Sequence, residues 1–432
     1  MTLKVSDLTQ ENEALKKELE TKKNSKNSSL PPAKDIAAVK KNQSLRKKSG
    51  KQKGGQKGHK GSTLKMTSTP DKIINQIPCF CSKCGDGLES ITALLKESRQ
   101  VVDIPPIVPI YTEYRSFSKT CPCGHENKGD FPANVNAPIQ YGPTVNSLIA
   151  YFSVRQYLPY QRMRECLNDI FGLQISQATL VNIVKKMARK SHCAHNKIKE
   201  NIFKSIVVGS DETGIKVNGD KGWLWVWQNK LYTYITVALS RGFKVIENEF
   251  PDGLPNSVLQ SDSLAAQLKT KAKVHQLCIA HLMREVQYFI DLYDDDWAKK
   301  MKELLLDSLV LKKQLVNYNQ DNAERHQLES RLDDLLAFQV ENQPKKIKPF
   351  HNRLAKYRTY LFPFLYYEQV SPDNNGAERA IRNAKVKMKI SGMFITLGSA
   401  MDFAVLRSVI DTSIKNKANI LHILRLTAKL PS

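Results

Sequence analysis

The chain has 432 residues, enough for several domains, and 41% of them are hydrophobic, which excludes a wholly disordered protein. Lys and Arg number 66 against 42 Asp and Glu, a formal net charge of +24 that indicates a polyanionic partner such as nucleic acid. No run of 18 apolar residues and no secretory signal is present, so we expect a cytoplasmic protein with no membrane partner.

The N-terminal segment has the spacing of a coiled coil. Val5, Asn12 and Leu19 lie seven residues apart, with Leu8 and Leu15 in the complementary register. This pattern predicts a short coiled coil whose Asn favours a dimer, so we expect a homo-oligomer. A frayed amphipathic helix is the alternative, because fewer than three heptads are marginal alone.

The next segment is strongly basic. Residues 21–65 hold fourteen Lys or Arg and one acid, Asp35, which is over half of the net charge. Residues 50–61 mix glycine with cations, a composition suited to a flexible strand along a phosphate backbone, with a solvated linker as the alternative. The lysines expected to contact DNA here are Lys51, Lys53, Lys57 and Lys60.

Five of the eight cysteines form two short turns within residues 71–135, and a glycine follows each turn. The alternation of Tyr111–Phe117 predicts a strand between the turns. Such a pair of turns predicts one structural Zn²⁺ in a tetrahedral site, against reduced thiols without metal. Cys79 and His125 are alternative ligands. The preferred ligands are Cys81, Cys84, Cys121 and Cys123.

Helices are expected across residues 136–204. An apolar helical period covers Tyr160–Phe171, Gly172 provides a stop, and Ser176 can cap a second helix from Gln177 to about Ala188. Two helices joined by a short turn form a candidate helix-turn-helix for DNA binding. A helix pair within an all-helical core is the alternative.

From residue 205 the pattern changes to strands. The expected strands are Ser205–Ser210, Gly222–Gln228, Tyr232–Ala238 and Ser257–Gln260, with a helix near Arg241–Phe250. A long helical stretch at about 264–361 and a last helical region at about 376–417 follow. The tryptophans of the second strand share one face, where core packing is favoured over a stacking platform for bases.

Three acids lie near the ends of these elements. Asp211 is expected to follow the first strand and Asp262 the fourth, and Glu378 lies in the first turn of a helix that Asp373 or Asn374 could cap. Three converging carboxylates can hold two Mg²⁺ or Mn²⁺ ions for phosphoryl transfer. By spacing alone this signal is weak, because the chain has 42 acids.

A series of motifs runs along the chain in a distinctive order. They are Gly54–Gly61, the cysteine turns, Tyr141-Gly-Pro, Leu158–Arg162, Ser210-Asp-Glu-Thr213, Cys278-Ile-Ala-His281-Leu-Met-Arg284, Asn374–Arg382 and Gly398-Ser399. In this order they resemble the insertion sequence 66 family of bacterial transposases over nearly the whole chain.

The resemblance implies a ribonuclease H-like catalytic domain in which Asp211, Asp262 and Glu378 form a triad that cuts and joins DNA. It implies double-stranded DNA partners, the terminal inverted repeats of the element and the target, with accessory proteins of the same element as further candidates. The alternative is a catalytically inactive zinc-containing DNA-binding protein or repressor derived from a transposase.

Cations accompany the Glu378 helix, either to hold DNA phosphate or to neutralise the acidic pocket. The family's usual Arg-Lys pair appears here as two lysines around a methionine, which keeps the charge but loses the planar guanidinium. The second cysteine pair is also one residue tighter than is common in the family. The cations expected to contact DNA are Arg379, Arg382, Lys387 and Lys389.

One further pair, Cys278 and His281, lies three residues apart on a predicted helix. A satisfied core pair is one interpretation, and metal binding or support of the active-site wall is the other.

The fold class expected from all these patterns is a multidomain α+β protein. It comprises a short coiled coil (1–22), a basic arm (23–70), a zinc-binding module (71–135), a helix-turn-helix region (136–204), a ribonuclease H-like α/β domain (205–400) with a helical insertion (about 265–361), and a helical tail (401–432).

Overall fold

The structure is a computed structural model that describes residues 27, 58, 61, 63–338 and 344–430. The chain divides into two compact units, residues 42–109 and residues 1–41 with 110–432. The expected coiled coil lies outside the described residues, and so do the four arm lysines Lys51, Lys53, Lys57 and Lys60.

The first cysteine turn, in the smaller unit, is closed by its own backbone. Cys81 N donates to Asp86 O at 2.8 Å, and Gly85 N donates to Cys81 O at 2.9 Å. Gly85 has a φ of 84°, which residues with a side chain rarely adopt. The glycine therefore makes this tight turn possible.

The second cysteine turn, in the larger unit, joins the short antiparallel strands β1 (Ser118–Thr120) and β2 (Glu126–Lys128). Gly124 N donates to Cys121 O at 2.8 Å within this turn. The prediction of a strand at Tyr111–Phe117 is wrong, because those residues form no strand. A strand needs a partner to bury its apolar face, and both end residues stay exposed here.

The two helices of the expected helix-turn-helix form with local caps. Helix α3 (Tyr160–Phe171) ends at Gly172, whose φ of 63° is left-handed. Helix α4 (Gln177–Lys190) begins after Ser176, whose side chain accepts a hydrogen bond from Thr179 N at 3.1 Å. The same region contains α2 (Pro143–Ala150), the π-helical turn η2 (Tyr151–Arg155) and α5 (His192–Phe203).

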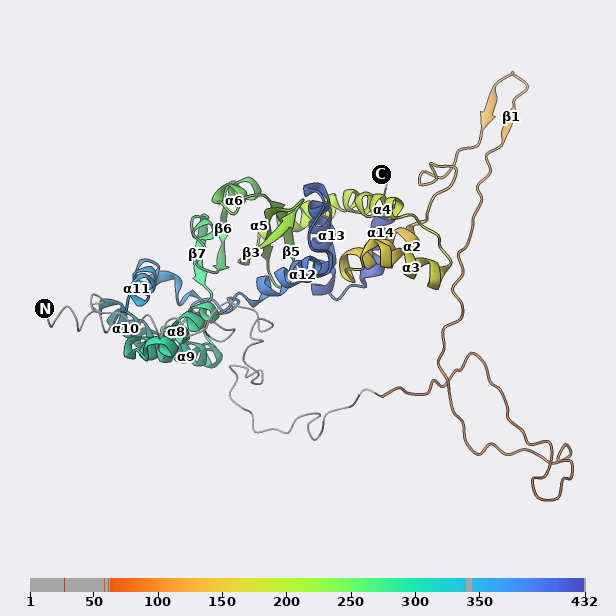
Figure 1. The fold of residues 1–432 in the computed structure, drawn as a ribbon, viewed down its shortest axis with the longest axis horizontal. Helices are drawn as coiled ribbons and strands as arrows, with labels where there is room; N and C mark the ends of the chain where they lie inside the picture. Colours follow the sequence, from red (N-terminus) through yellow and green to blue (C-terminus); the bar gives the residue numbers. More distant parts are fainter. Residues whose placement is uncertain (1–26, 28–57, 59–60, 62, 339–343, 431–432) are drawn as a thin grey trace. The chain divides into compact units, whose positions relative to one another are not determined.

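A five-stranded mixed sheet lies at the centre of the larger unit (Figure 1). Its order is β5-β4-β3-β6-β7, with β3, β4 and β5 antiparallel and with β6 and β7 parallel to β3. The strands are β3 (Val207–Val217), β4 (Asp220–Gln228), β5 (Thr233–Ala238), β6 (Leu254–Ser261) and β7 (Ala272–Leu277).

Strand β3 is longer than expected. It continues past Ser210 because Thr213, Ile215 and Val217 are buried alternately with exposed residues and pair with β4. Asp211 therefore lies within the strand, so the expectation that it follows the strand is wrong.

Strand β7 lies where only helix was expected. Polar residues occupy buried positions in it, which hides the pattern of a strand: His275 contacts Thr270 O through Nε2 at 3.0 Å, and Gln276 donates to Leu361 O at 3.1 Å. Both side chains are satisfied by backbone carbonyls, and the partner of Gln276 lies far along the chain.

Helices cover both faces of the sheet. Helices α12 (Asn375–Ser391) and α13 (Leu397–Lys415) pack on one face, and α5 and α6 (Phe243–Glu249) pack on the other. The domain boundary expected at residue 400 falls inside α13, which is buried against β5. Helix α14 (Ile420–Lys429) packs against α2.

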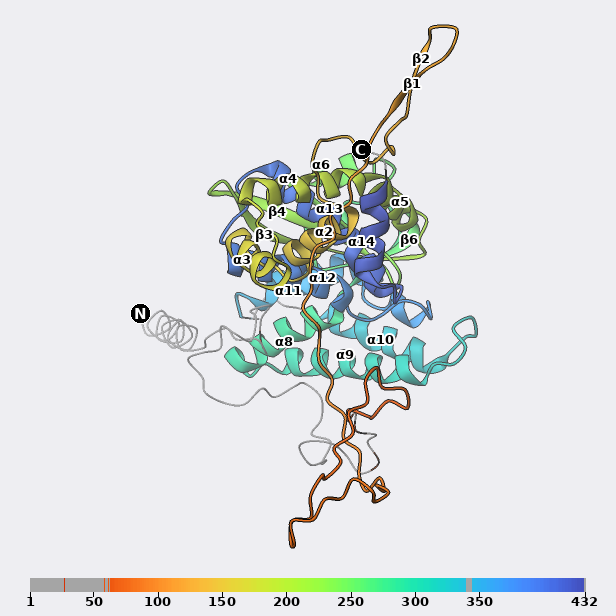
Figure 2. The ribbon, with the colours of Figure 1, turned by 90° about the vertical axis from the view of Figure 1, so that its right-hand side faces the viewer.

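The remaining helices form a group with its own core beside β7 (Figures 1 and 2). They include α8 (Ile279–Tyr293), α9 (Asp296–Gln314), α10 (Ala323–Ala337) and α11 (Ile347–Lys356), with α7 (Ala265–Leu268) preceding β7 and the 3₁₀ turns η3 (Arg358–Tyr360) and η4 (Pro363–Leu365) following α11. No helix in the described part of the chain is long and apolar enough to cross a membrane.

Candidate active site

Three elements place the predicted carboxylates in one region of the larger unit. Asp211 lies within β3, Asp262 directly follows β6, and Glu378 lies in the first turn of α12. Strands β3 and β6 are parallel neighbours, and α12 packs against β3. The three acids, distant in the sequence, thus lie on adjacent elements.

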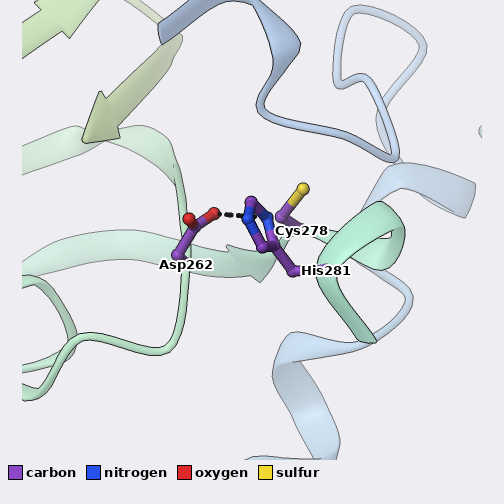
Figure 3. Close-up of side chains that lie close together, drawn as sticks. All are labelled: Asp262, Cys278 and His281. Carbon is purple, nitrogen blue, oxygen red and sulfur yellow. Dashed lines mark ion pairs between the residues drawn. The ribbon is translucent and has the colours of Figure 1, made fainter. Parts of the chain in front are cut away.

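His281, on helix α8, contacts two of these carboxylates. Its Nδ1 lies 2.9 Å from Asp262 Oδ1 and 3.6 Å from Glu378 Oε1. Figure 3 shows the His281 ring directed at the Asp262 carboxylate. On the same helix, Arg284 Nη2 lies 3.4 Å from Glu378 Oε1. Two side chains of α8 therefore face the acids of β6 and α12.

Asp211 is in an environment that disfavours its negative charge. Burial first, and then the charges of Asp262 and Glu212, raise the pKa of Asp211 well above its ordinary value. Its Oδ1 accepts one hydrogen bond, from Glu212 N at 2.8 Å. A cation bound between Asp211 and Asp262 would relieve this repulsion.

His281 and Arg284 are the side chains of α8 that supply positive charge to the acids. Burial lowers the pKa of His281, but the contacts with Asp262 and Cys278 outweigh burial and raise the pKa of His281 to about 10. The carboxylate of Asp262 thus favours the protonated imidazole, which offsets part of the acidic charge.

The side chains of Asp262, Cys278 and His281 each place one potential ligand atom within 4.8 Å of the others (Figure 3). The Cys278 sulfur already accepts a hydrogen bond from Asn374 N at 3.3 Å. Of the interpretations left open for the pair, the geometry places His281 in the wall of the carboxylate site, with Cys278 buried behind it.

The three carboxylates suit Mg²⁺ better than zinc. Asp211, Asp262 and Glu378 offer only carboxylate oxygens, the donors that Mg²⁺ prefers, whereas a thiolate and an imidazole suit zinc. Asp262 Oδ1 is buried and has no hydrogen-bond donor among the described residues, apart from its close contact with His281. These donors fit a hard divalent cation.

Helix α12 approaches the sheet very closely at its first turn. Asn374 Nδ2 donates to Ser210 O at 2.7 Å, beside Asp211 in the chain. A Cβ atom on Gly209 would lie 2.5 Å from Asn374 Oδ1, and one on Gly376 would lie 2.4 Å from Gln228 Nε2. The two glycines allow the contact that brings Glu378 beside β3.

The expected cap of α12 is divided between two residues. Asn374 occupies the N-cap position, but its side chain makes no capping hydrogen bond, because it is used to bind β3. Asp373 instead accepts a hydrogen bond from Asn375 N at 3.1 Å. The start of the helix is therefore tied to the strand that carries Asp211.

Glu212, the neighbour of Asp211, faces the other side of the sheet. Its Oε1 accepts hydrogen bonds from Nε and Nη2 of Arg241 at 2.9 and 2.6 Å, and its Oε2 accepts one from Gln267 at 2.9 Å. Burial raises the pKa of Glu212, and Arg241 opposes that rise. These partners hold the Glu212 side chain on that face, although its charge still acts on Asp211 and Asp262.

The predicted cations of α12 differ in exposure. Arg379, Arg382 and Lys389 are exposed, whereas Lys387 is half-buried, and burial lowers its pKa. Sequence reasoning did not assign Arg284 a role. The spacing of Cys278, His281 and Arg284 at intervals of three residues was the available signal, since it places them along one side of a helix.

Comparison with known proteins gives one match that includes these residues. The family model described as "Transposase IS66 family" matches residues 138–402, and a family of unknown function (DUF6444) matches residues 3–65. A search of curated proteins finds no match. The first match extends from the segment before α2 into α13 and spans more than half of the 432 residues. The chain belongs to the IS66 family of transposases.

Proposed function

We propose that the protein is a Mg²⁺-dependent DNA transposase that binds the ends of an insertion sequence, cleaves there and joins the freed strand to target DNA. Asp211, Asp262 and Glu378 are its proposed catalytic residues. The observation that carries this is the placement of the three acids on β3, β6 and α12, with His281 contacting two of them. The strand order and directions support a ribonuclease H-like domain.

Two Mg²⁺ or Mn²⁺ ions held by these carboxylates would supply Lewis-acid catalysis and lower the pKa of a bound water. The protein's own contribution is to fix the acids in place. His281 and Arg284 orient Asp262 and Glu378, and the Asn374 side chain holds α12 against β3. Water attacks the phosphodiester at the element end, and the freed 3′-hydroxyl then attacks target DNA, without a covalent enzyme intermediate.

DNA binding is proposed for the helix-turn-helix pair, the basic arm and the cations of α12, in a homo-oligomer that is at least a dimer. Helix α4 supports this assignment because one side packs into the core while polar side chains occupy the other. Side chains of that kind can read base edges and phosphates. The exposed polar residues of α4 are Gln177, Asn182, Lys185 and Arg189.

A single structural Zn²⁺ is proposed for Cys81, Cys84, Cys121 and Cys123. The closed backbone turns at Gly85 and Gly124 support it. Metal analysis of freshly reduced protein should find about one zinc per chain, and Cys84→Ser should lower that content. Protein that is folded and free of zinc would refute the site.

The catalytic proposal is tested by single substitutions of the three acids. Asp211→Ala, Asp262→Ala and Glu378→Ala should each lower Mg²⁺-dependent cleavage and joining of end DNA by orders of magnitude, because each removes a metal ligand. DNA binding should survive, since phosphate contacts come from other elements.

Glu212→Gln is the matched control, because Glu212 neighbours Asp211 but faces Arg241 and Gln267. It should retain most of the activity. If Asp211→Ala stays active while Glu212→Gln does not, the first ligand is assigned wrongly. A wild-type protein that binds end DNA and never cleaves it would favour the inactive DNA-binding protein instead.

A further inference from the structure

Trp223 differs from the other tryptophans of its strand. Trp225 and Trp227 lie on the same face of β4 and are 0% and 1% exposed, whereas Trp223 is half-buried. Lys221 Nζ and Arg241 Cζ each lie 4.8 Å from the centroid of the Trp223 ring. The outer end of this strand face is therefore a partly exposed aromatic ring with two cations.

A second pair of observations concerns the neighbouring strand β3. Lys216 lies directly opposite Lys221, and like charges in that arrangement destabilise a sheet. Neither lysine has an ion-pair partner within the described ranges. Gly214 lies directly opposite Trp223, and an added Cβ there would meet nothing within 4 Å. Open space thus lies beside the indole, between unpaired cations.

We call Gly214, Lys216, Lys221, Trp223 and Arg241 the Trp223 patch. The acid on this face of β3, Glu212, is buried and already paired with Arg241 and Gln267, so the patch remains positive. An aromatic face surrounded by cations is the arrangement by which proteins hold single-stranded nucleic acid, through base stacking and phosphate contacts.

We propose that the Trp223 patch binds a DNA strand at an unpaired base, with the indole stacked on the base and Lys216 and Lys221 on the flanking phosphates. The inference rests on the proposed function, because cleavage and joining at a DNA end act where bases leave the duplex. Gly214 is three residues from Asp211 along β3, or roughly 10 Å, and faces the opposite side of the sheet. The patch can therefore hold only a strand that extends past the carboxylate site and around β3.

The tryptophan fluorescence of the full-length protein reports on stacking of a base on Trp223. Trp225, Trp227 and Trp297 are at most 4% exposed, so Trp223 is the tryptophan on which a base can stack. In buffer without Mg²⁺ or Mn²⁺, where the proposed cleavage cannot occur, a single-stranded oligonucleotide and a duplex with a 3′ overhang should quench the emission of the wild type. A blunt duplex should quench it much less.

Matched variants show which tryptophan is responsible for the quenching. Trp223→Phe should lose it, and Trp297→Phe should keep it. Trp223→Ala should weaken binding of the single strand about 5- to 100-fold, as loss of one stacked base does elsewhere. Urea unfolding of each variant checks that the fold is retained.

The charge component is tested separately. Lys216→Gln with Lys221→Gln should reduce the slope of log affinity against log salt by about 1.4 for a single strand, as expected for two lost phosphate contacts. Lys300→Gln with Lys313→Gln, both exposed on α9, removes the same charge elsewhere and should leave the quenching unchanged.

Quenching that persists in Trp223→Phe, or that a blunt duplex produces equally, would overturn the proposal. Neither result affects the catalytic proposal, which depends on cleavage by the wild type and its loss in Asp211→Ala. Conversely, quenching by single strands in a protein that never cleaves DNA would retain the patch and refute the transposase activity.

Discussion

His281 is one of two side chains, with Arg284, that offset the charge of Asp262 and Glu378. We expect His281→Ala to lower the free energy of unfolding by about 1–3 kcal/mol in Mg²⁺-free buffer, because the acids lose a buried polar partner. Saturating Mg²⁺ should recover most of that loss, since the cation replaces the imidazole charge.

Urea unfolding with and without Mg²⁺ measures both effects. His422→Ala, at an exposed histidine of α14, serves as the control and should show neither. A His281→Ala protein whose stability is low and insensitive to Mg²⁺ would mean that the imidazole only fills space.

Lys415 predicts a pH dependence of stability. Its Nζ donates to Gln228 Oε1, Asn229 O and Tyr232 O at 2.8, 2.7 and 2.9 Å, and burial lowers the pKa of Lys415 to about 8. A lysine in an unfolded chain has a pKa of about 10.4. Between these values the unfolded chain holds a proton that the folded chain has released, so stability rises with pH.

Lys415→Met should remove that rise. Between pH 7.5 and pH 10, the stability of the wild type should increase relative to the variant by about 2 kcal/mol, as the two pKa values require. Urea unfolding across this range provides the test. Parallel curves for the two proteins would show that Lys415 stays charged in the fold.

At the scale of elements, the close contact of α12 with the sheet predicts that even a methyl group added at Gly376 destabilises the protein. Gly376→Ala should lower the free energy of unfolding by about 1–3 kcal/mol, because a Cβ would lie 2.4 Å from Gln228 Nε2. It should also lower the rate of end cleavage, because the added group displaces the turn that carries Glu378.

Gly398→Ala is the control for this change, because the nearest atom to its added Cβ is 3.8 Å away. Unfolding and end cleavage are measured for both variants. A Gly376→Ala protein as stable and active as Gly398→Ala would mean that the Gln228 side chain moves aside freely.

Some elements follow from local chemistry, and the sequence predicts them well. The turn between α3 and α4 depends on a left-handed Gly172 and a capping Ser176, both of which act within a few residues. Strand β7 depends instead on Gln276 meeting the backbone of Leu361, far along the chain. No local pattern contains that partner, so the strand was missed.

In the candidate site too, some features follow from local sequence and others from contacts between distant elements. Motifs indicate Asp211, Asp262 and Glu378, but the contacts of Glu378 with His281 and Arg284 arise only when α8 and α12 meet, nearly a hundred residues apart. Motif spacing gives the residue types of the acids, whereas packing between distant helices gives their partners.

At the scale of the whole larger unit, a buried ion pair links the helical region to the sheet-covering helices. Arg407 on α13 pairs with Asp411 and also donates to Tyr157 Oη at 2.9 Å and Val154 O at 3.3 Å. The Arg407 side chain is 1% exposed. The guanidinium therefore joins α13 to η2 and to Tyr157, two residues after η2.

Asp411→Ala should destabilise the protein by about 3–5 kcal/mol, because it leaves a buried guanidinium without its counter-charge. Replacing both partners, Arg407→Met with Asp411→Leu, should cost less than the single change. Urea unfolding compares the variants. A double variant at least as unstable as Asp411→Ala would show that the Tyr157 and Val154 contacts matter more than the charge.

The fixed start of α12 makes the spacing of its first turn critical. Each residue of an α-helix advances the direction of the side chains by about 100°. Asn374 and Gly376 are held against the sheet, and Glu378 follows only two residues later. Deleting one residue between them would turn the carboxylate about a quarter of a turn away from His281 while leaving the composition almost unchanged. In this segment, length constrains the protein as strongly as residue identity does.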